Sequence, residues 1–266
     1  MKLGIIGLGK IGEAVVLGIR RSQHAKDFTV NATTRSDESA KDVTGRLSIR
    51  CHTDNRKLAA DSEVLLLSVK PHQARAVLQE ISDVLTPKHL LISVVASITT
   101  EQLAEWSGGA AAVVRTMPNT PSLIGEGMTV ITAGPGAKPV HLQKAEKIFS
   151  SVGKTATVEE SLMDGVTGLS GCGPAYIYLI IEALSEAGVK VGLPRKTATL
   201  LAAQTLLGAS KMVLERGDHP AALKDEVTTP AGCTIDGLMA LEEGKLRVTL
   251  IKAVLAAARR SKMLRM

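Results

Sequence analysis

The stretch Gly4-Ile5-Ile6-Gly7-Leu8-Gly9-Lys10-Ile11-Gly12 lies near the start of the chain, between an apolar run of strand length and a helical pattern. It contains a complete G-x-G-x-x-G sequence. In this setting Gly7 permits a tight turn, Gly9 lets the backbone approach a pyrophosphate, and Gly12 lets the helix pack closely on the strand. Phosphates would face the N-terminus of that helix. The stretch therefore predicts a dinucleotide site, and the alternative is an ordinary glycine-rich turn between a strand and a helix.

The end of the second expected strand, residues 28–32, indicates which dinucleotide binds. Proteins that bind NAD carry an acidic residue about 20 residues after the glycines, where it binds the ribose 2′-hydroxyl. This chain has Thr33-Thr34-Arg35-Ser36 there instead. The donors of Arg35 suit a 2′-phosphate, and the hydroxyls of Thr34 and Ser36 can add hydrogen bonds. We therefore expect NADPH to bind, with NADH weaker, unless Arg35 is only a solvated loop cation.

Further apolar runs of strand length alternate with helical or turn-rich segments. Continuous Val, Ile and Leu runs at crossover spacing are typical of a parallel sheet that is covered on both faces. The length of 266 residues and a change of pattern near residue 160 favour two domains. We predict a doubly wound Rossmann domain of α/β class over residues 1–158. Its further strands are expected at 63–69, 90–96, 111–116 and 128–132.

Beyond residue 158 the apolar pattern becomes helical, and Leu, Ala, Met and Lys dominate. We predict an all-α domain over residues 159–266. Residues 197–210 carry no charge and are more apolar than one exposed amphipathic face requires. Either a second subunit or the Rossmann domain of the same chain must cover them. The expected helices are 173–190, 194–216, 223–227, 234–243 and 246–263.

The charge and the aromatic content argue against a nucleic-acid partner. The formal net charge is +6, but the basic residues are scattered along the chain. One Trp, two Tyr and two Phe provide no stacking surface for single-stranded nucleic acid. We therefore expect no nucleic acid among the partners.

The cysteines and the apolar stretches indicate the compartment. Cys51, Cys172 and Cys233 form no C-x-x-C pair and cannot all be paired within one chain, which fits a reducing compartment. The longest uncharged stretch, residues 165–181, is broken by glycines and Pro174, so it is a poor membrane span. We expect a soluble, cytoplasmic protein with no membrane partner, and the sequence predicts no metal site.

Two loops follow expected strands, at the edge where open α/β sheets bind ligands. In Ser68-Val69-Lys70-Pro71, backbone groups can contact the nicotinamide half of the cofactor, and Lys70 would be a cation near its phosphates. The alternative for Lys70 is a solvated residue before a proline that starts a helix. The loop Arg115-Thr116-Met117-Pro118-Asn119-Thr120-Pro121 should be rigid because its prolines fix φ. By itself this second loop is weak evidence for a site.

A third candidate is the segment 224–234, which leads into the expected helix 234–243. The backbone N–H groups of Gly232, Cys233 and Thr234 would lie at a helix N-terminus without intrahelical partners, which suits a carboxylate. Thr234 also adds a hydroxyl group. The alternative is an ordinary helix start that is capped by threonine or cysteine.

Several of these segments, in this order and spacing, resemble pyrroline-5-carboxylate reductase over essentially the whole chain. Its most specific parts are the Ser-Gly-x-Gly-Pro-Ala-Tyr stretch and the Thr-Pro-x-Gly-x-Thr loop. The segments are residues 7–12, Val69-Lys70-Pro71, Met117-Pro118-Asn119-Thr120-Pro121, Leu169-Ser170-Gly171-Cys172-Gly173-Pro174-Ala175-Tyr176 and residues 227–237.

The resemblance implies an oxidoreductase of proline biosynthesis that transfers hydride from NADPH to 1-pyrroline-5-carboxylate and so makes L-proline. It implies a helical second domain through which two subunits interlock as a homodimer, with the active site between the Rossmann domain of one subunit and the helical domain of the other. A larger assembly of dimers is left open.

The resemblance and the motifs together predict the site residues. Thr234 is the expected catalytic residue, which would bond the ring nitrogen and relay a proton, although water or the substrate itself can be the proton source. The expected substrate-binding residues are Glu160, Val227, Thr229, Gly232, Cys233 and Thr234. The expected cofactor-binding residues are Ile6, Gly7, Leu8, Gly9, Lys10, Ile11, Gly12, Thr34, Arg35, Ser36, Asn55, Ser68, Val69, Lys70 and Ala96.

Four positions depart from the family pattern. Ser97 and Ala231 stand where glycine is usual, Cys172 stands where serine is usual, and Glu226 stands where some members have an asparagine near the cofactor. These four positions bear on fine substrate preference and on cofactor affinity. Two other functions remain: an NADPH-dependent reductase of another cyclic imino acid, and a non-catalytic dinucleotide-binding regulator. The complete loop from Thr229 to Thr234 argues against the regulator.

Overall fold

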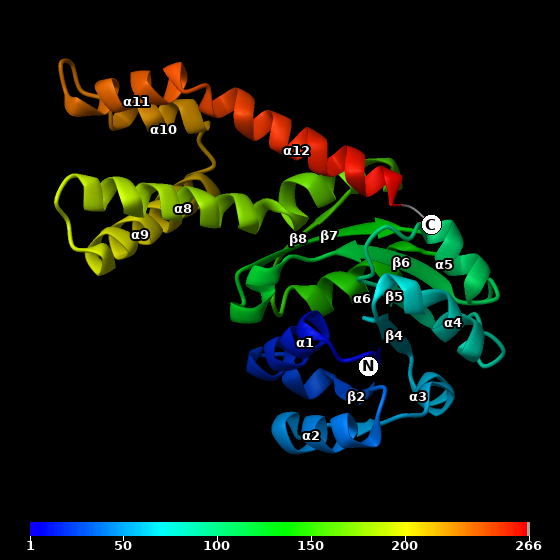
Figure 1. Ribbon diagram of the computed structural model, residues 1–266. Coiled ribbons are helices and arrows are strands. Elements are labelled where there is room, and N and C mark those ends of the chain that lie inside the picture. Colours follow the sequence, from blue (N-terminus) through cyan, green and yellow to red (C-terminus); the bar gives the residue numbers. More distant parts are fainter. Residues whose placement is uncertain (265–266) are drawn as a thin grey trace. The chain divides into compact units, whose positions relative to one another are not determined.

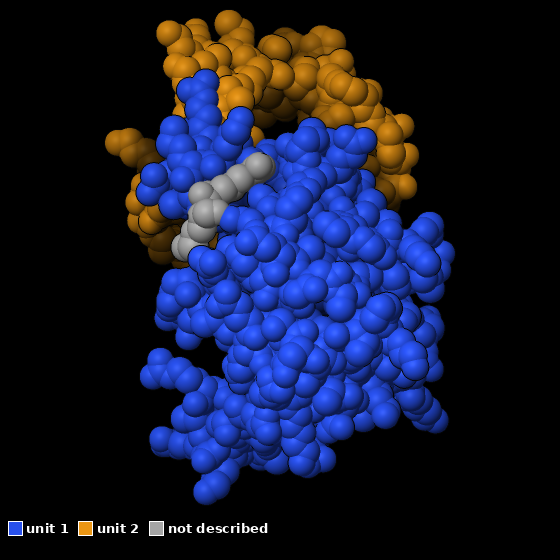
Figure 2. Space-filling model, turned by 90° about the vertical axis from the view of Figure 1, so that its right-hand side faces the viewer, with its two compact units in different colours: residues 1–172, 256–266 blue, residues 173–255 orange. Residues whose placement is uncertain are grey.

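The computed structural model describes residues 1–264, which fold into two compact units (Figure 2). Unit 1 comprises Met1–Cys172 and the residues from Ala256 onward, and unit 2 comprises Gly173–Leu255. The contacts thus place residues 159–172 with the sheet, whereas the sequence pattern placed them with the helical domain. Residues 265–266 of the expected second domain lie outside the described residues.

Unit 1 is built on an eight-stranded sheet with the order β3-β2-β1-β4-β5-β6-β7-β8 (Figure 1). The reversal of strand order at β1 and β4 is the doubly wound arrangement that the sequence predicts. The strands are β1 (Lys2–Ile6), β2 (Thr29–Thr33), β3 (Arg50–His52), β4 (Val64–Leu67), β5 (Leu90–Ser93), β6 (Ala112–Met117), β7 (Gly127–Ala133) and β8 (Gly153–Thr157). The main helices are α1 (Lys10–Arg21), α2 (Asp37–Leu47), α3 (Asn55–Asp61), α4 (Pro71–Ile81), α5 (Thr100–Trp106) and α6 (Pro139–Phe149).

The sheet departs from the expected all-parallel arrangement at one pair, because β7 runs antiparallel to β6. The connection between them, residues 118–126, contains only the 3₁₀ turn η2 (Thr120–Ile124). A parallel connection needs a crossover of a dozen or more residues. The longer connection that holds α6 does cross over, so β8 is parallel to β7.

The two strands that the apolar pattern missed, β3 and β8, are the end strands of the sheet. Their sequences, Arg-Cys-His and Gly-Lys-Thr-Ala-Thr, contain no continuous apolar run. A strand at the end of a sheet is paired on one side only and is less deeply covered than a central one, so it tolerates polar residues.

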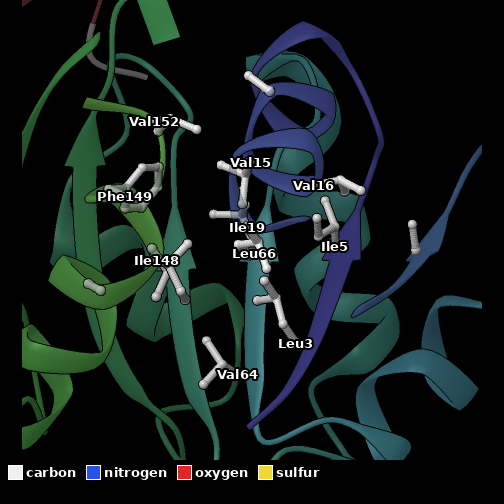
Figure 3. Close-up of a cluster of buried hydrophobic side chains, with 14 of the residues drawn as sticks. Leu3, Ile5, Val15, Val16, Ile19, Val64, Leu66, Ile148, Phe149 and Val152 are labelled. Carbon is white, nitrogen blue, oxygen red and sulfur yellow. The ribbon is translucent and has the colours of Figure 1, made fainter. Parts of the chain in front are cut away.

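Helices cover both faces of the central strands, as the sequence predicts. Successive residues of each strand alternate between two hydrophobic clusters, so that Leu3 and Ile5 join one cluster and Ile6 joins the other. Figure 3 shows the first cluster, in which Val15 and Ile19 of α1 pack near Leu66 of β4. This packing fixes α1, and therefore the glycine loop before it, against the sheet.

One register row crosses the sheet at the carboxyl ends of the central strands. Ile6 of β1 is paired with Leu67 of β4, Leu67 with Ser93 of β5, and Ser93 with Arg115 of β6. The loops that follow β1, β4 and β5 therefore begin at the same edge of the sheet. This is the edge where ligands bind in open α/β folds.

The last part of unit 1 before Cys172 is a chain of short helical turns. They are η3 (Glu160–Leu162), α7 (Met163–Val166) and the π-helix η4 (Thr167–Gly171). The hydroxyl of Ser261 donates to Asp164 Oδ1 at 2.9 Å, and this buried bond ties the end of α12 to α7. Short π-helical stretches occur frequently at functional sites.

Unit 2 is entirely helical. Its helices are α8 (Gly173–Lys190), α9 (Arg195–Arg216), α10 (Pro220–Glu226), α11 (Cys233–Glu243) and most of α12 (Leu246–Met263), whose last residues belong to unit 1. The expected helix 223–227 begins three residues earlier, at Pro220, because proline is well placed in the first turn of a helix.

Helix α9, which contains the uncharged stretch 197–210, packs on α8, and a Cβ on Gly188 would lie 2.7 Å from the Cβ of Ala198. Only Ala198 and Ala202 of α9 are buried, while Leu200 is 66% exposed. The other helices of unit 2 thus leave most of α9 uncovered. By length and composition alone, α9 is also the one described helix that could cross a membrane, with a mean hydropathy of 1.2.

Candidate active site

The glycine loop at the end of β1 is shaped so that only glycine fits at its first position. Gly7 has a φ of +79°, and a Cβ there would lie 2.5 Å from Cγ1 of Val69. Around Gly9 the nearest atom to an added Cβ is the Ser68 carbonyl oxygen at 3.9 Å, so the backbone is open to a ligand. Gly9 is the N-cap of α1 and no side chain caps that helix. Its first N–H groups are therefore available to an anion.

A cavity of about 680 Å³ opens beside this loop, entirely within unit 1. This volume is within the range of about 300–1,000 Å³ that is usual for small-molecule and cofactor sites. The predicted cofactor residues that line it are Ile6, Gly7, Leu8, Gly9, Thr34, Arg35, Asn55, Ser68, Val69 and Lys70. Segments from four separate parts of the sequence thus meet at one site.

The remaining predicted cofactor residues do not line the cavity. Lys10, Ile11 and Gly12 form the first turn of α1, where backbone N–H groups rather than side chains would meet a phosphate. Ser36 is the N-cap of α2, and its hydroxyl oxygen accepts from the Ser39 backbone N–H at 3.3 Å. Ala96 follows β5, outside the lining.

Several lining residues were missed by the sequence analysis. Some of them recur on one face of α2 at positions 39, 42, 43 and 46, which is a helical spacing that follows directly from Arg35. That spacing is the signal that could have found them. The missed residues are Thr33, Glu38, Ser39, Asp42, Val43, Arg46, Gln73 and Val77.

The cavity contains two guanidinium groups with different electrostatic surroundings. Arg46 bonds the carboxylate of Glu13, and its Nε lies 3.5 Å from Oδ2 of Asp42. The hydrogen bond that Arg46 donates to the Glu13 carboxylate raises the pKa of Arg46 above its ordinary value. Within the described part of the chain Arg35 makes no ion pair. Of these two guanidinium groups, Arg35 is therefore the one whose positive charge no described carboxylate compensates.

Two further predicted residues are held in place by hydrogen bonds. Asn55 accepts from the hydroxyl of Thr33 at 2.7 Å and donates to Glu80 Oε2 at 2.9 Å, which fixes the orientation of its amide. Lys70 is the N-cap of α4, and its backbone N–H donates to Gln73 Oε1 at 3.3 Å. The proline that follows Lys70 does start a helix, as its position suggested.

In unit 2 the structure brings the predicted substrate residues Val227, Thr229, Gly232, Cys233 and Thr234 together around the start of α11. Gly232 is the N-cap of this helix, and no side chain caps it, so neither the cysteine nor the threonine serves that purpose. Thr234 is half-buried in its first turn. The first N–H groups of α11 are consequently free of side-chain caps, which suits them to a carboxylate.

Glu226, at the end of α10, is held by Arg216 of α9. The two side chains form a bidentate pair with distances of 2.8 and 2.7 Å, and Arg216 Nη2 also lies 2.6 Å from Asp218 Oδ2. The hydrogen bond from Arg216 lowers the pKa of Glu226 below its ordinary value. The carboxylate of Glu226 is thus kept ionised and directed toward α9.

We expect this pair to break only in acid. A carboxyl group with a lowered pKa contributes its stabilisation above its ordinary value, about 4.3, and loses it as the pH falls through the lowered pKa. In an NMR titration of the Glu226 carboxyl, the Arg216→Gln variant should show a pKa that returns toward the ordinary value. An unchanged pKa in that variant would contradict the role assigned to Arg216.

Glu160, the remaining predicted substrate residue, lies in unit 1 and pairs with Arg115. Arg115 is only 1% exposed, and its Nη1 lies 2.5 Å from Oε1 of Glu160. The loop after Arg115 is tied to its surroundings by the Asn119 side chain, which accepts from Met128 N at 2.9 Å and donates to Ser170 O at 3.3 Å. Sequence reasoning did not foresee that the arginine itself would be buried with Glu160.

A doubly wound sheet with an uncapped glycine loop and an adjoining cavity of this size defines a dinucleotide-binding protein of Rossmann type. Comparisons with known proteins agree. Residues 2–97 match the family model described as NADP oxidoreductase, coenzyme F420-dependent, and residues 160–264 match the model for pyrroline-5-carboxylate reductase dimerisation.

Relatives match over nearly the whole chain. The pyrroline-5-carboxylate reductase of Methanosarcina acetivorans is 42% identical over 98% of this chain and 97% of its own length. A solved pyrroline-5-carboxylate reductase from Coxiella burnetii has a TM-score of 0.94 at 37% identity, covering 99% of this chain and 98% of its own. The Plasmodium falciparum pyrroline carboxylate reductase with NADP bound has a TM-score of 0.86 at 33% identity, covering 100% and 98%. The chain belongs to the pyrroline-5-carboxylate reductase family.

Proposed function

We propose that this protein reduces 1-pyrroline-5-carboxylate to L-proline with NADPH, the last step of proline biosynthesis. The observation that carries the proposal is the match to reductases of this name over 98% of the chain. The cavity of unit 1 and the uncapped start of α11 supply a cofactor site and an anion site that this reaction needs.

The residues of unit 1 fit NADPH. The open space beside Gly9 would let the backbone approach a pyrophosphate, and the first N–H groups of α1 would bind its charge. The uncompensated Arg35 suits the 2′-phosphate, with Thr34 beside it. Ser68, Val69 and Lys70 line the cavity after β4 and would hold the nicotinamide half. NADPH supplies the hydride when it is bound.

The residues of unit 2 orient the substrate. The first N–H groups of α11 would hold its carboxylate, with Gly232 and Cys233 contributing backbone and Thr229 and Val227 forming the wall of the loop. Thr234 would hydrogen-bond the ring nitrogen of the neutral imine and relay to it the proton that makes the imine a better electrophile, so that hydride addition then leaves an amine. A threonine hydroxyl is a poor acid, so its main contribution is to orient the ring and relay a proton from water or from the substrate.

The exposed apolar surface of α9 supports a homodimer. The dimerisation family model spans residues 160–264, which include α9, and Leu200 and Leu201 of that helix are 66% and 51% exposed. A second copy of the chain that packs on α9 would bury this surface and exclude water from it. We propose that the enzyme is a cytoplasmic homodimer, and that α9 is an interface helix rather than a membrane span.

The direct test is to follow NADPH absorbance with the purified protein. With pyrroline-5-carboxylate present the absorbance should fall, and an equimolar amount of L-proline should form. A faster reaction with a cyclic imino acid of different ring size would favour the alternative substrate class. Binding of NADPH without any turnover of either imino acid would favour the non-catalytic regulator.

The Thr234→Ala variant should lose catalytic rate more than substrate affinity. It keeps the backbone N–H groups of α11 but removes the hydroxyl that faces the ring nitrogen. Loss of one polar contact in the transition state, worth about 1.4 to 2.7 kcal/mol, corresponds to a 10- to 100-fold fall in kcat/KM, mostly in kcat. Steady-state kinetics at saturating NADPH measure this.

Thr228 offers a matched control in the same loop, because its hydroxyl is already bonded to the carbonyl of Lys224 at 2.8 Å. Thr228→Ala should therefore leave kcat nearly unchanged, and Thr234→Ser should restore most of the rate. Normal turnover by Thr234→Ala would show that the proton reaches the nitrogen by another route.

A further inference from the structure

Buried polar side-chain atoms without a hydrogen-bond partner are few within residues 1–264, and they fall in two short stretches of unit 1. Arg115 and Ser122 belong to β6 and the loop after it, and Glu160 and Ser170 belong to η3 and η4. Such atoms are costly, so each one in a folded protein needs a physical explanation. The atoms are Arg115 Nη2, Ser122 Oγ, Glu160 Oε2 and Ser170 Oγ.

The two stretches are in contact with each other. Besides the Arg115–Glu160 pair, the Asn119 side chain donates to the carbonyl of Ser170 at 3.3 Å, and a Cβ on Gly171 would lie 2.7 Å from Cε of Met117. The turns η3 to η4 therefore pack over the carboxyl end of β6. The partnerless atoms of Arg115 and Glu160 belong to this contact.

The register of the sheet places this contact relative to the cofactor loops. Arg115 shares one row with Leu67, the last residue of β4, and the two strands are separated only by β5. At about 4.8 Å between neighbouring strands, Arg115 lies roughly 10 Å from the strand that leads into Ser68–Lys70. The pair is thus at the edge of the sheet that carries the nicotinamide end of the proposed cofactor site.

The Arg115–Glu160 pair differs in geometry from an exposed arginine–carboxylate pair of the same chain. The exposed pair Arg56–Asp83 is bidentate, with Nη1–Oδ1 at 2.5 Å and Nη2–Oδ2 at 2.6 Å. In the partly buried pair of Arg115 and Glu160 only Nη1 and Oε1 meet, which leaves the buried atoms Nη2 and Oε2 without a hydrogen-bond partner. A buried carboxylate is stable only when its charge is compensated and its oxygens are satisfied. The spare oxygen of Glu160 is therefore suited to a cationic partner from outside the protein.

We propose that Arg115 is a positioning residue for the reduction. It compensates the charge of Glu160 through one oxygen and so turns the other, Oε2, toward the protonated ring nitrogen of the cyclic imine. The protonated imine is the better electrophile and carries the positive charge that complements this oxygen. Arg115 itself does not contact the substrate. The inference rests on the proposed function, which it deepens by assigning a residue that organises the substrate pocket.

The test is a double-mutant cycle in the full-length enzyme with Arg115→Met, Glu160→Gln and the combination of both. At saturating NADPH, Arg115→Met should raise KM for pyrroline-5-carboxylate about 10- to 100-fold, with a smaller change in kcat and unchanged NADPH affinity. If Arg115 acts only through Glu160, the combined variant should have the KM of Glu160→Gln alone, because the effects of coupled residues do not add. Arg115→Lys, which keeps one charge, should recover much of the wild-type KM.

Arg56→Met is the matched control, because it breaks an arginine–carboxylate pair that does not line the cofactor cavity. It should leave KM unchanged. Arg115→Met leaves a buried carboxylate unpaired and can fail to fold. In that event two other variants can still be compared with Glu160→Gln in their KM for pyrroline-5-carboxylate. They are the combined variant, which removes both charges, and Arg115→Lys.

Two results would overturn the proposal. Additive effects of the two substitutions on KM would show that Arg115 acts on the substrate itself or only on stability. A wild-type KM in Glu160→Gln would show that the spare oxygen does not meet the substrate. Either result leaves the proposed function intact, whereas a wild-type protein that does not oxidise NADPH with pyrroline-5-carboxylate would refute that function first.

Discussion

The Arg35→Asp variant should lose its preference for NADPH. Arg35 lines the cofactor cavity and makes no ion pair with other described residues, so its charge is available to a 2′-phosphate. Hydrogen bonds to a charged group contribute about 1.5–3 kcal/mol, and the new carboxylate would also repel the phosphate. The ratio of NADPH to NADH affinity should therefore fall by roughly 100-fold or more. NADH has a 2′-hydroxyl in place of the 2′-phosphate, so it should bind the variant at least as well as it binds the wild-type protein.

Fluorescence titration with each cofactor measures this change. Arg50→Asp is the matched control, because Arg50 is an exposed arginine on β3 that does not line the cavity. That control should alter neither affinity much. Equal weakening of NADPH and NADH by Arg35→Asp would show that Arg35 supports the loop rather than the 2′-phosphate, and Arg46 would then be the next residue to test.

Leu200→Glu on α9 should abolish activity by preventing the dimer. Leu200 is 66% exposed in the single chain, within a stretch from 197 to 210 that carries no charge. If a second subunit covers this helix, the substitution buries an unpaired carboxylate at the interface, which costs several kcal/mol. The resemblance places each active site between two subunits, so loss of the dimer should reduce turnover to background. Sedimentation velocity and NADPH oxidation, measured on the same sample, test both parts.

Val140→Glu is the matched control, because it places the same charge on an exposed apolar residue outside unit 2. Val140 is an apolar residue of α6 that is 49% exposed. Its replacement should leave the oligomeric state and the rate unchanged. A compact and active monomer, whether wild-type or Leu200→Glu, would show that one chain contains a complete site.

The sequence was sufficient wherever a feature is formed by neighbours in the chain. The glycine loop and α1 follow from nine consecutive residues, and the central strands follow from continuous apolar runs, because both depend on local backbone conformation and on burial from both faces. The start of α11 was predicted one residue late, at Thr234 instead of Cys233, which is the usual precision for a helix end. Family membership likewise follows from segments that can be read in the sequence.

Features that depend on residues far apart in the chain could not be predicted from local sequence patterns. The reversed direction of β7 depends on a connection too short to cross the sheet, although its apolar pattern equals that of a parallel strand. The helical spacing along α2 indicates that one face is shared, but only the packed structure showed that this face lines the cavity beside the glycine loop.

The sequence by itself determined a Rossmann sheet, a helical second unit, a dinucleotide site and the family of the enzyme, because each depends on residues that are close together in the chain or on motifs with fixed spacing. Only the tertiary structure decided that Arg115 is buried and paired with Glu160, 45 residues further along. A charged side chain can be buried only where folding brings an opposite charge to it. No local pattern of residues specifies that meeting, since it depends on how the turns after β8 pack on β6.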